Sequence, residues 1–312
     1  MEQEIEIKEK KRFNFKFWFS GKGFKILKFI IVLVIVIASS IIIKDEVFWQ
    51  LSSDSSMGDN LSEGSTAQKT EDFVGQEEED NCNVSGINFH GDLYTYIPAS
   101  DYGADGNLMY DEVGAENLTY YIEEAEKNNN IKAIILEIDS RGGSPVAGEE
   151  IANVLRRVQK PTVALIRESG TSAAYYAATG ADRIFASVNS DVGSIGVTMS
   201  YLDNSLQNQK EGLTYNQLSV GKYKDAGDPD RKLTTEEIAI FMRDLDIIHQ
   251  NFIKAVAENR NLDINKVKAL ADGSSMLGEA ALKNGLIDEI GDINSVKEYL
   301  KEKIGADIEI CW

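Results

Sequence analysis

The chain is poor in histidine and cysteine, and this scarcity narrows the catalytic chemistries open to it. Its 312 residues include two His and two Cys. His249 lies in a stretch with helical spacing and His90 lies near an early strand, and neither is next to a nucleophile-like motif. A Ser-His-Asp triad and a zinc site are therefore disfavoured. Neither Cys82 nor Cys311 lies in a pattern expected of a thiol nucleophile.

Positive charge is also scarce relative to negative charge, which argues against a nucleic-acid partner. The chain has 32 Lys and Arg against 51 Asp and Glu, a formal net charge of -19. Nucleic-acid phosphates attract Lys and Arg surfaces, so a nucleic-acid partner is disfavoured. The charge is unevenly placed, because the first 28 residues carry eight Lys or Arg and four Glu while the chain after Ile43 is strongly acidic.

An apolar run lies between the basic and the acidic parts. Phe29–Ile43 carries no charge, and counting from Phe24 gives twenty residues, about one bilayer span. A buried core helix is disfavoured because no amphipathic stripe interrupts the run. A cleaved signal peptide is compatible with the basic and apolar regions, but Ala38-Ser39-Ser40 is followed by three more isoleucines. An uncleaved signal anchor is the favoured interpretation.

This anchor predicts the organisation of the whole chain. The excess of Lys and Arg before the run places the N-terminus in the cytoplasm and the remainder outside the cell membrane. The stretch after the run is rich in Ser, Gly and acidic residues and predicts a disordered tether. The predicted segments are a basic cytoplasmic segment (1–23), a transmembrane anchor (24–43), a linker (44–83) and an extracytoplasmic domain (84–312). Outside the cell Cys82 and Cys311 could form a disulfide, and two free thiols are equally compatible with the sequence.

Predicted strands and helices alternate through the first part of this domain. The spacing predicts buried strands at 132–138, 162–166 and 183–186, with helices at 147–158 and 172–179. Beyond Lys224 the pattern is mainly helical, at 234–259, 265–271, 277–284 and 295–303. Such alternation predicts βαβ units, a mostly parallel sheet and an α/β fold.

Three short motifs carry candidate chemistry, and the first is a glycine turn. Asp139–Ser144 follows a predicted strand and precedes a helix, where glycines let backbone N–H groups face a ligand. The turn could cradle a phosphate, form an oxyanion hole or be a simple tight turn. No Gly-Lys-Ser/Thr follows, which excludes a nucleotide P-loop.

The other two motifs contain a serine and a lysine. Ser172 starts a predicted helix among small residues, a setting that suits a nucleophile and equally an N-cap. Lys224 lies in the polar loop Gly221–Arg231, after a strand-like Leu218–Val220. Lysines in polar loops are ordinarily solvated, so each motif alone is compatible with a purely structural role.

Together the three motifs resemble the signal peptide peptidase A (SppA) family of bacterial membrane serine peptidases, in its short form with one catalytic domain. That family has Asn/Asp-Ser-Pro-Gly-Gly at the turn, Ala-Ser-Gly-Gly-Tyr-Tyr at the nucleophile and Gly-x-x-Lys-Asp/Ser before Pro-x-Arg at the base. The resemblance covers about Val84 to Gly291. The matching stretches, in the family's order, are Asp139–Gly143, Thr171–Tyr176, 181–186, 192–197, Gly221–Arg231 and 278–291.

The resemblance implies a site and a fold. Ser172 would be the nucleophile, Lys224 the general base and Ser194 the residue that orients the lysine. The amides of Gly143 and Ala173 would form the oxyanion hole, and this dyad needs no metal or cofactor. The implied fold is the crotonase-like, Clp-protease-like spiral of βαβ units.

The resemblance also implies a homo-oligomer. A lysine with a pKa of about 10.4 is protonated at neutral pH, and burial is what releases its proton. Lys224 must therefore be buried when active, and in short members of the family neighbouring subunits complete each other's dyad. Two departures, Arg141 for the family's proline and Ala173-Ala174 for its paired glycines, are expected to alter substrate fit while leaving the dyad intact.

The predicted function is a membrane-anchored serine endopeptidase that degrades remnant signal peptides and other extended or unfolded polypeptides. A non-catalytic oligomeric scaffold or binding protein on the same fold is the alternative, but a scaffold has no reason to keep Ser172 and Lys224 in register. A crotonase-type acyl-CoA enzyme would need no transmembrane anchor.

Overall fold

A computed structural model describes residues 82–103 and 107–312, all of which lie in one compact unit, Gln76–Trp312. The predicted segments 1–23 and 24–43, and the linker up to residue 81, lie outside the described residues. Within the described ranges no helix is both long enough and apolar enough to span a bilayer.

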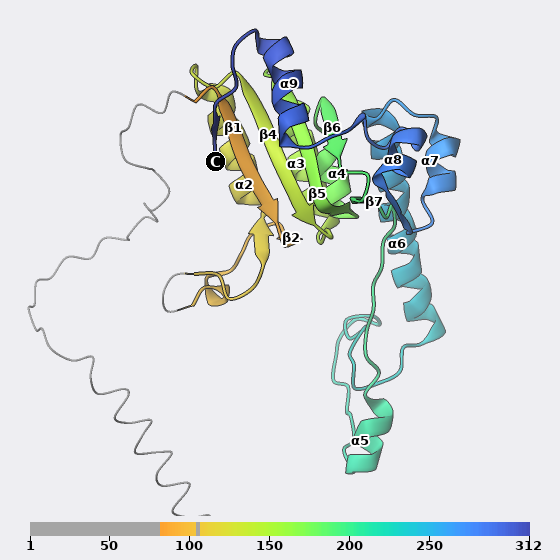
Figure 1. Cartoon of the computed structure of the whole chain (residues 1–312). Coiled ribbons are helices and arrows are strands. Elements are labelled where there is room, and N and C mark those ends of the chain that lie inside the picture. The colour runs from red at the N-terminus through yellow and green to blue at the C-terminus, as the bar shows by residue number, and fades with distance from the viewer. Residues whose placement is uncertain (1–81, 104–106) are drawn as a thin grey trace, which may run out of the picture. The chain divides into compact units, whose positions relative to one another are not determined.

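The centre of this unit is an eight-stranded, mainly parallel sheet (Figure 1). Its main path has the order β10-β1-β4-β5-β6-β9, with β7 paired to β5 and β8 paired antiparallel to β7. The strands are β1 (Val84–His90), β4 (Ala133–Ser140), β5 (Thr162–Thr171), β6 (Arg183–Ala186), β7 (Asp191–Gly193), β8 (Ser275–Leu277), β9 (Glu289–Ile290) and β10 (Ile310–Cys311). A short parallel pair is formed by β2 (Asp92–Tyr94) and β3 (Glu112–Gly114). The predicted α/β class is thus confirmed, whereas the spiral assembly of βαβ units stays a prediction.

Helices cover both faces of the sheet because both faces are apolar. Alternate β4 residues point to opposite faces: Ile134 and Leu136 belong to the core under α2, α3 and α4, and Ala133 and Ile135 to the core under α9. The helices are η2 (Ala99–Asp101), α2 (Ala115–Lys127), α3 (Pro145–Leu155), α4 (Ala173–Ala178), α5 (Ser205–Glu211), α6 (Thr235–Asn259), α7 (Ile264–Leu270), α8 (Gly278–Asn284) and α9 (Ile293–Ile304).

The predicted elements are found within a few residues, with one exception. Helix α3 begins two residues early because Ser144 caps it, accepting a hydrogen bond from Ala147 N, and Pro145 suits its first turn. The strand-like interpretation of Leu218–Val220 is wrong, since this segment forms no strand. Its Leu218 and Val220 side chains are 99% and 97% exposed, so the apolar pattern has nothing to pack against within the described chain.

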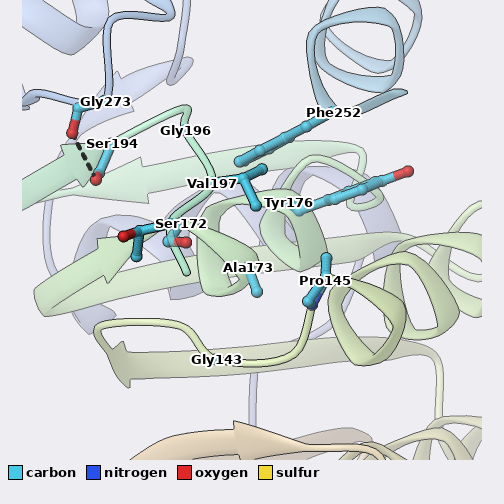
Figure 2. Close-up of a pocket in the computed structure, with 11 residues that line it drawn as sticks. Gly143, Pro145, Ser172, Ala173, Tyr176, Ser194, Gly196, Val197, Phe252 and Gly273 are labelled. Carbon is cyan, nitrogen blue, oxygen red and sulfur yellow. Dashed lines mark hydrogen bonds between the residues drawn. The ribbon is translucent and has the colours of Figure 1, made fainter. Parts of the chain in front are cut away.

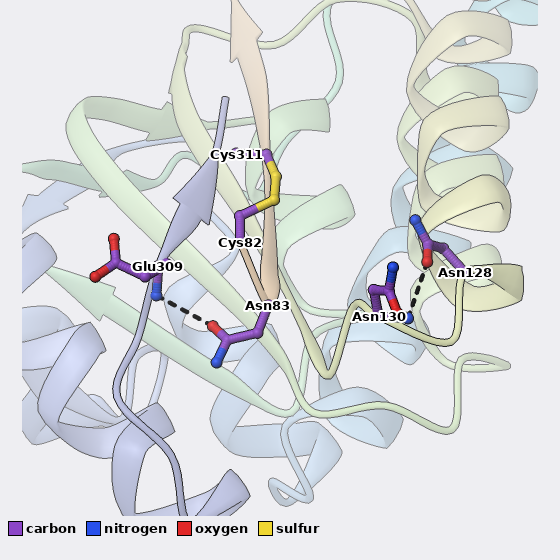
Figure 3. Close-up of a disulfide and its surroundings, with 6 residues drawn as sticks. All are labelled: Cys82, Asn83, Asn128, Asn130, Glu309 and Cys311. Atoms are coloured by element: carbon purple, nitrogen blue, oxygen red, sulfur yellow. Dashed lines mark hydrogen bonds between the residues drawn. A yellow bond between two sulfur atoms is a disulfide. The ribbon is translucent and has the colours of Figure 1, made fainter. Parts of the chain in front are cut away.

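The two cysteines, which the sequence left undecided, form a disulfide (Figure 3). Cys82 lies just before β1 and Cys311 in β10, the strand paired with β1 at the sheet edge, and their Cα atoms are 5.7 Å apart. Asn83 reinforces the junction, because its side-chain oxygen accepts a hydrogen bond from Glu309 N at 3.1 Å. The ends of the domain are therefore joined to each other.

Removal of this disulfide should lower stability substantially. It closes a loop across a sequence separation of 229 residues, and cross-links over long loops restrict the unfolded chain most. We expect Cys311→Ser to lower the free energy of unfolding by about 2–5 kcal/mol, measured by urea denaturation. Reductant should shift the wild type by a similar amount and leave Cys311→Ser unchanged. Equal midpoints for wild type and Cys311→Ser would contradict this stabilising role.

Candidate active site

Ser172 lies at a sharp turn between β5 and α4, in a backbone conformation that is rare for serine. Its φ is 53° and its ψ is -127°. The turn is held by hydrogen bonds from Ser172 N to Gly193 O (2.8 Å) and from Tyr176 N to Ser172 O (3.0 Å). All six residues of α4 are buried, so the helix cannot relax around the serine. Strained conformations of this kind persist where packing imposes them, and they cluster at active sites.

The side chain of Ser172 does not cap the helix that follows it. Ser172 occupies the N-cap position of α4, but its hydroxyl accepts no hydrogen bond from the first turn. The N-cap interpretation left open by the sequence is therefore wrong. Its positive φ turns the hydroxyl out of the capping position, and the group lies at a cavity rim instead.

The glycine turn packs directly against this serine. Gly142 and Gly143 have φ values of 105° and 148°, in the region that favours glycine. A Cβ added at Gly142 would lie 2.8 Å from both Ala173 N and Ser172 Cβ. Gly143 pairs with Leu93 as in a parallel sheet, because Leu93 N donates to Gly142 O and Ser144 N donates to Leu93 O. The N–H of Gly143 itself therefore points away from Leu93.

These contacts bring the two predicted amides close to the predicted nucleophile. Ala173 is the first residue of α4, so its N–H has no partner within the helix. The helix N-terminus also carries partial positive charge. Two such amides beside a serine hydroxyl can stabilise negative charge that develops on a carbonyl oxygen.

Replacement of Gly142 by alanine should test this close packing. The new Cβ would meet backbone atoms at 2.8–2.9 Å and force a left-handed conformation on alanine. We expect a loss of about 1–3 kcal/mol in unfolding free energy from backbone strain alone, together with a large loss of any Ser172-dependent activity.

Gly305, at the C-terminal end of α9, offers a matched control for that substitution. It has φ +70°, but no atom lies within 4 Å of an added Cβ. Gly305→Ala should therefore cost about 1–2 kcal/mol and leave activity intact. Equal activity of the two alanine variants would contradict a role for the glycine turn beside Ser172.

A cavity of about 250 Å³ opens beside Ser172 (Figure 2). Its walls are mainly apolar, and the rings of Tyr176 and Phe252 stack with centroids 5.0 Å apart. Burial, reinforced by Glu149 and Glu258, raises the pKa of Tyr176 to about 12, so its phenol stays neutral at physiological pH. The lining residues are Gly143, Pro145, Ser172, Ala173, Tyr176, Ser194, Gly196, Val197, Thr198, Phe252 and Gly273.

Four of the five predicted site residues thus line one cavity. Ser194, predicted to orient the lysine, also has a positive φ of 48°, and its hydroxyl donates to Gly273 O at 2.9 Å. Pro145 and Phe252 were not predicted as site residues. Pro145 follows the glycine turn directly, but Phe252 is 80 residues after Ser172 in a long amphipathic helix, where sequence carries no signal for it.

Lys224 is the predicted site residue that the single chain does not bring to this cavity. It is exposed and does not line the pocket. Its loop belongs to a long stretch, Gly196 to Asn251, in which Glu237 is the one buried residue. In Figure 1 most of this stretch lies around α5 and the start of α6, away from the sheet. The expected burial of Lys224 is therefore absent from the isolated chain.

Neither histidine takes part in the cavity. His90 Nε2 lies 3.4 Å from Glu137, which also pairs with Arg167 at 2.8 Å, and His249 lies within α6. Within the part of the chain that the structure describes, no group of three His, Cys, Asp or Glu side chains could hold a metal ion.

An α/β protein in which a positive-φ serine lines a cavity together with Gly143 and Ala173 has an arrangement that acyl-transfer enzymes use. Residues 155–307 match the model of peptidase family S49, a range that contains Ser172, Ser194 and Lys224. A protein named "Putative protease MJ0651" from Methanocaldococcus jannaschii is 37% identical over 59% of this chain and 60% of its own length. "Putative signal peptide peptidase SppA" from Enterococcus faecium is 30% identical over 65% of this chain and 60% of its own.

The S49 match and these relatives support the SppA-type peptidase family for the part of the chain that carries the site. The chain spans about 60% of the length of these curated relatives. Among solved structures, a point mutant of ClpP1 from Listeria monocytogenes is similar with a TM-score of 0.43 and 14% identity, covering 66% of this chain and 91% of that one.

Proposed function

We propose that this chain is a serine endopeptidase with Ser172 as nucleophile and Lys224 as general base. The observation that carries the proposal is the uncapped hydroxyl of Ser172, held at a positive-φ turn on the rim of an apolar cavity. A nucleophilic serine at a strand-to-helix turn needs a hydroxyl that does not cap the helix and is exposed to substrate. A strained backbone at the turn is typical of such sites.

The proposed reaction proceeds through an acyl-enzyme. The neutral Lys224 amine takes the proton of the Ser172 hydroxyl while the serine oxygen attacks the scissile carbonyl. The N–H groups of Gly143 and Ala173 donate to the oxygen that becomes negative. The protonated lysine returns its proton to the leaving amine, and a water molecule, activated by the same amine, releases the acyl group.

The cavity supports an extended substrate with an apolar side chain before the cut. The stacked Tyr176 and Phe252 rings and the Val197 side chain offer an apolar wall next to Ser172. Remnant signal peptides and unfolded chains supply such side chains in extended form. These are the proposed substrates.

The exposed position of Lys224 supports an oligomeric enzyme in which the base reaches the serine of a neighbouring subunit. The stretch that carries Lys224 exposes large apolar side chains, which a second copy of the chain could cover. They include Leu202 (79%), Leu206 (61%), Leu218 (99%) and Val220 (97%). A neighbour seated there would also exclude water from the lysine, as its role as a base requires.

The function is tested by cleavage of an apolar fluorogenic peptide and of an unfolded protein by the purified domain. Wild type should cleave both and should be labelled by a fluorophosphonate at Ser172, identified by peptide mass spectrometry. Ser172→Ala should do neither. Wild type that is folded and oligomeric but neither cleaves nor labels would favour the scaffold alternative.

We further propose that residues 24–43 anchor the chain in the cell membrane with the peptidase domain outside. The Cys82–Cys311 disulfide supports this location, because disulfides persist in oxidising compartments. Protease added to intact cells should remove the C-terminal domain, as followed by an antibody against it. Full protection until the cells are lysed would contradict the topology.

A further inference from the structure

We propose that Arg231 and Glu237 are positioning residues that hold the Lys224 loop on the N-terminus of α6. The proposal rests on the function proposed for Lys224. Both side chains lie outside the cavity, so they would act through the placement of the lysine and not by contact with substrate.

Glu237 is the centre of this arrangement. Its side chain is 4% exposed, and its carboxylate accepts hydrogen bonds from Arg231 Nη1 (2.9 Å) and Nη2 (2.5 Å). The same carboxylate accepts from Thr234 N (2.8 Å), and Thr234 Oγ1 accepts from Glu237 N, which completes a capping box at the start of α6. One carboxylate therefore caps the helix and binds the guanidinium in a bidentate pair.

Arg231 connects this helix start to the residue that follows Lys224. Its Nη2 also donates to Asp225 O at 2.6 Å, and its Nε lies 3.5 Å from the Asp225 carboxylate. That carboxylate accepts a hydrogen bond from Tyr215 OH at 2.5 Å. The peptide carbonyl and the side chain of Asp225 are thus both hydrogen-bonded, and Asp225 directly follows Lys224 in the chain.

No hydrophobic core holds the Lys224 loop in place within the described chain. From Gly196 to Asn251 Glu237 is the one buried residue, while α6 reaches the main core only at its other end, through Phe252 and Ile253. The hydrogen bonds of Arg231 to Glu237 and Asp225 instead connect the loop to the start of α6. A guanidinium fork has fixed geometry, so it can impose orientation as well as attraction.

The ion pair should persist throughout the assay range. Hydrogen bonds from Arg231 and Thr234 lower the pKa of Glu237 to about 2, so the carboxylate stays charged at any pH at which the peptidase would be assayed. A change in the pH–rate profile of a variant therefore reports on the catalytic groups and not on titration of Glu237.

The test compares two neighbouring carboxylates in the full oligomeric enzyme. Glu237→Gln and Arg231→Met should lower kcat about 10²-fold, the scale expected when a catalytic group is displaced by about 1 Å, with KM nearly unchanged. The midpoint of the rising pH–rate limb should also move to higher pH, because a displaced lysine is less desolvated. The matched control is Glu236→Gln, whose partner Lys222 forms an exposed pair at 2.5 Å in the same helical turn. Glu236→Gln should keep wild-type kcat and midpoint.

The possible results distinguish a positioning role of Arg231 and Glu237 from a purely stabilising role. They also distinguish both from a wrong assignment of the Ser172–Lys224 dyad. Arg231→Lys, which keeps the charge and loses the fork, should fall between wild type and Arg231→Met, and it replaces Arg231→Met if that variant does not fold. Activity that falls only in proportion to the folded fraction, with an unchanged pH midpoint, would overturn the proposal. Wild-type activity of Lys224→Ala would instead overturn the dyad, and with it any positioning role.

Discussion

Lys224→Ala should abolish peptide cleavage while the neighbouring Lys222→Ala retains most of it. Removal of a general base typically costs about 10²–10⁴-fold in rate, and groups that act as one unit fail together. We therefore expect Lys224→Ala to be nearly as inactive as Ser172→Ala, measured as kcat/KM on an apolar fluorogenic peptide.

Lys222 is a close control for this substitution. It lies in the same loop, and its ammonium group pairs with Glu236 at 2.5 Å and lies 5.0 Å from the centre of the Tyr223 ring. Hydrogen bonds with Glu236 raise the pKa of Lys222 well above its usual value, so it is a poor base. Both side chains of the pair are more than 60% exposed, and such pairs contribute little to stability. An inactive Lys222→Ala beside an active Lys224→Ala would show that Lys224 is not the base.

Mixing inactive Ser172→Ala with inactive Lys224→Ala should restore activity. If the lysine serves the serine of a neighbouring subunit, some contacts in a mixed oligomer join an intact Ser172 to an intact Lys224. The structure provides the reason to expect this, since Lys224 is exposed and absent from the cavity of its own chain. The measurement is turnover after the two variants are refolded together, compared with each variant refolded alone.

Two further measurements serve as controls for the mixing experiment. Dilution of the wild type below its assembly concentration should lower its specific activity, because association follows mass action. Each variant should also form oligomers of wild-type size by light scattering. Verified mixed oligomers without activity would contradict the shared site and place both residues in one subunit.

The sequence by itself determined the α/β class and the identity of the candidate catalytic residues. Both depend on local information. The β-branched run around Ile134 and Ile135 predicts a strand wherever it lies, and the predicted strand at 183–186 coincides with β6. The motifs around Gly143 and Ser172 are contiguous, so their chemistry could be recognised before any contact was known.

Other features were decided only by tertiary structure, because they depend on what lies next to a segment in space. By sequence Ser172 could be a cap or a nucleophile. Its positive φ and uncapped hydroxyl belong to a turn that is held against the glycine turn and hydrogen-bonded to Gly193 O. Leu218–Val220 has the composition of a strand, but a strand needs a partner, and the described chain offers none. Phe252 joins the cavity wall, and Cys82 meets Cys311, only because distant parts of the chain fold together. Local pattern determines what a segment can become, and long-range packing decides which of those possibilities has the lowest free energy.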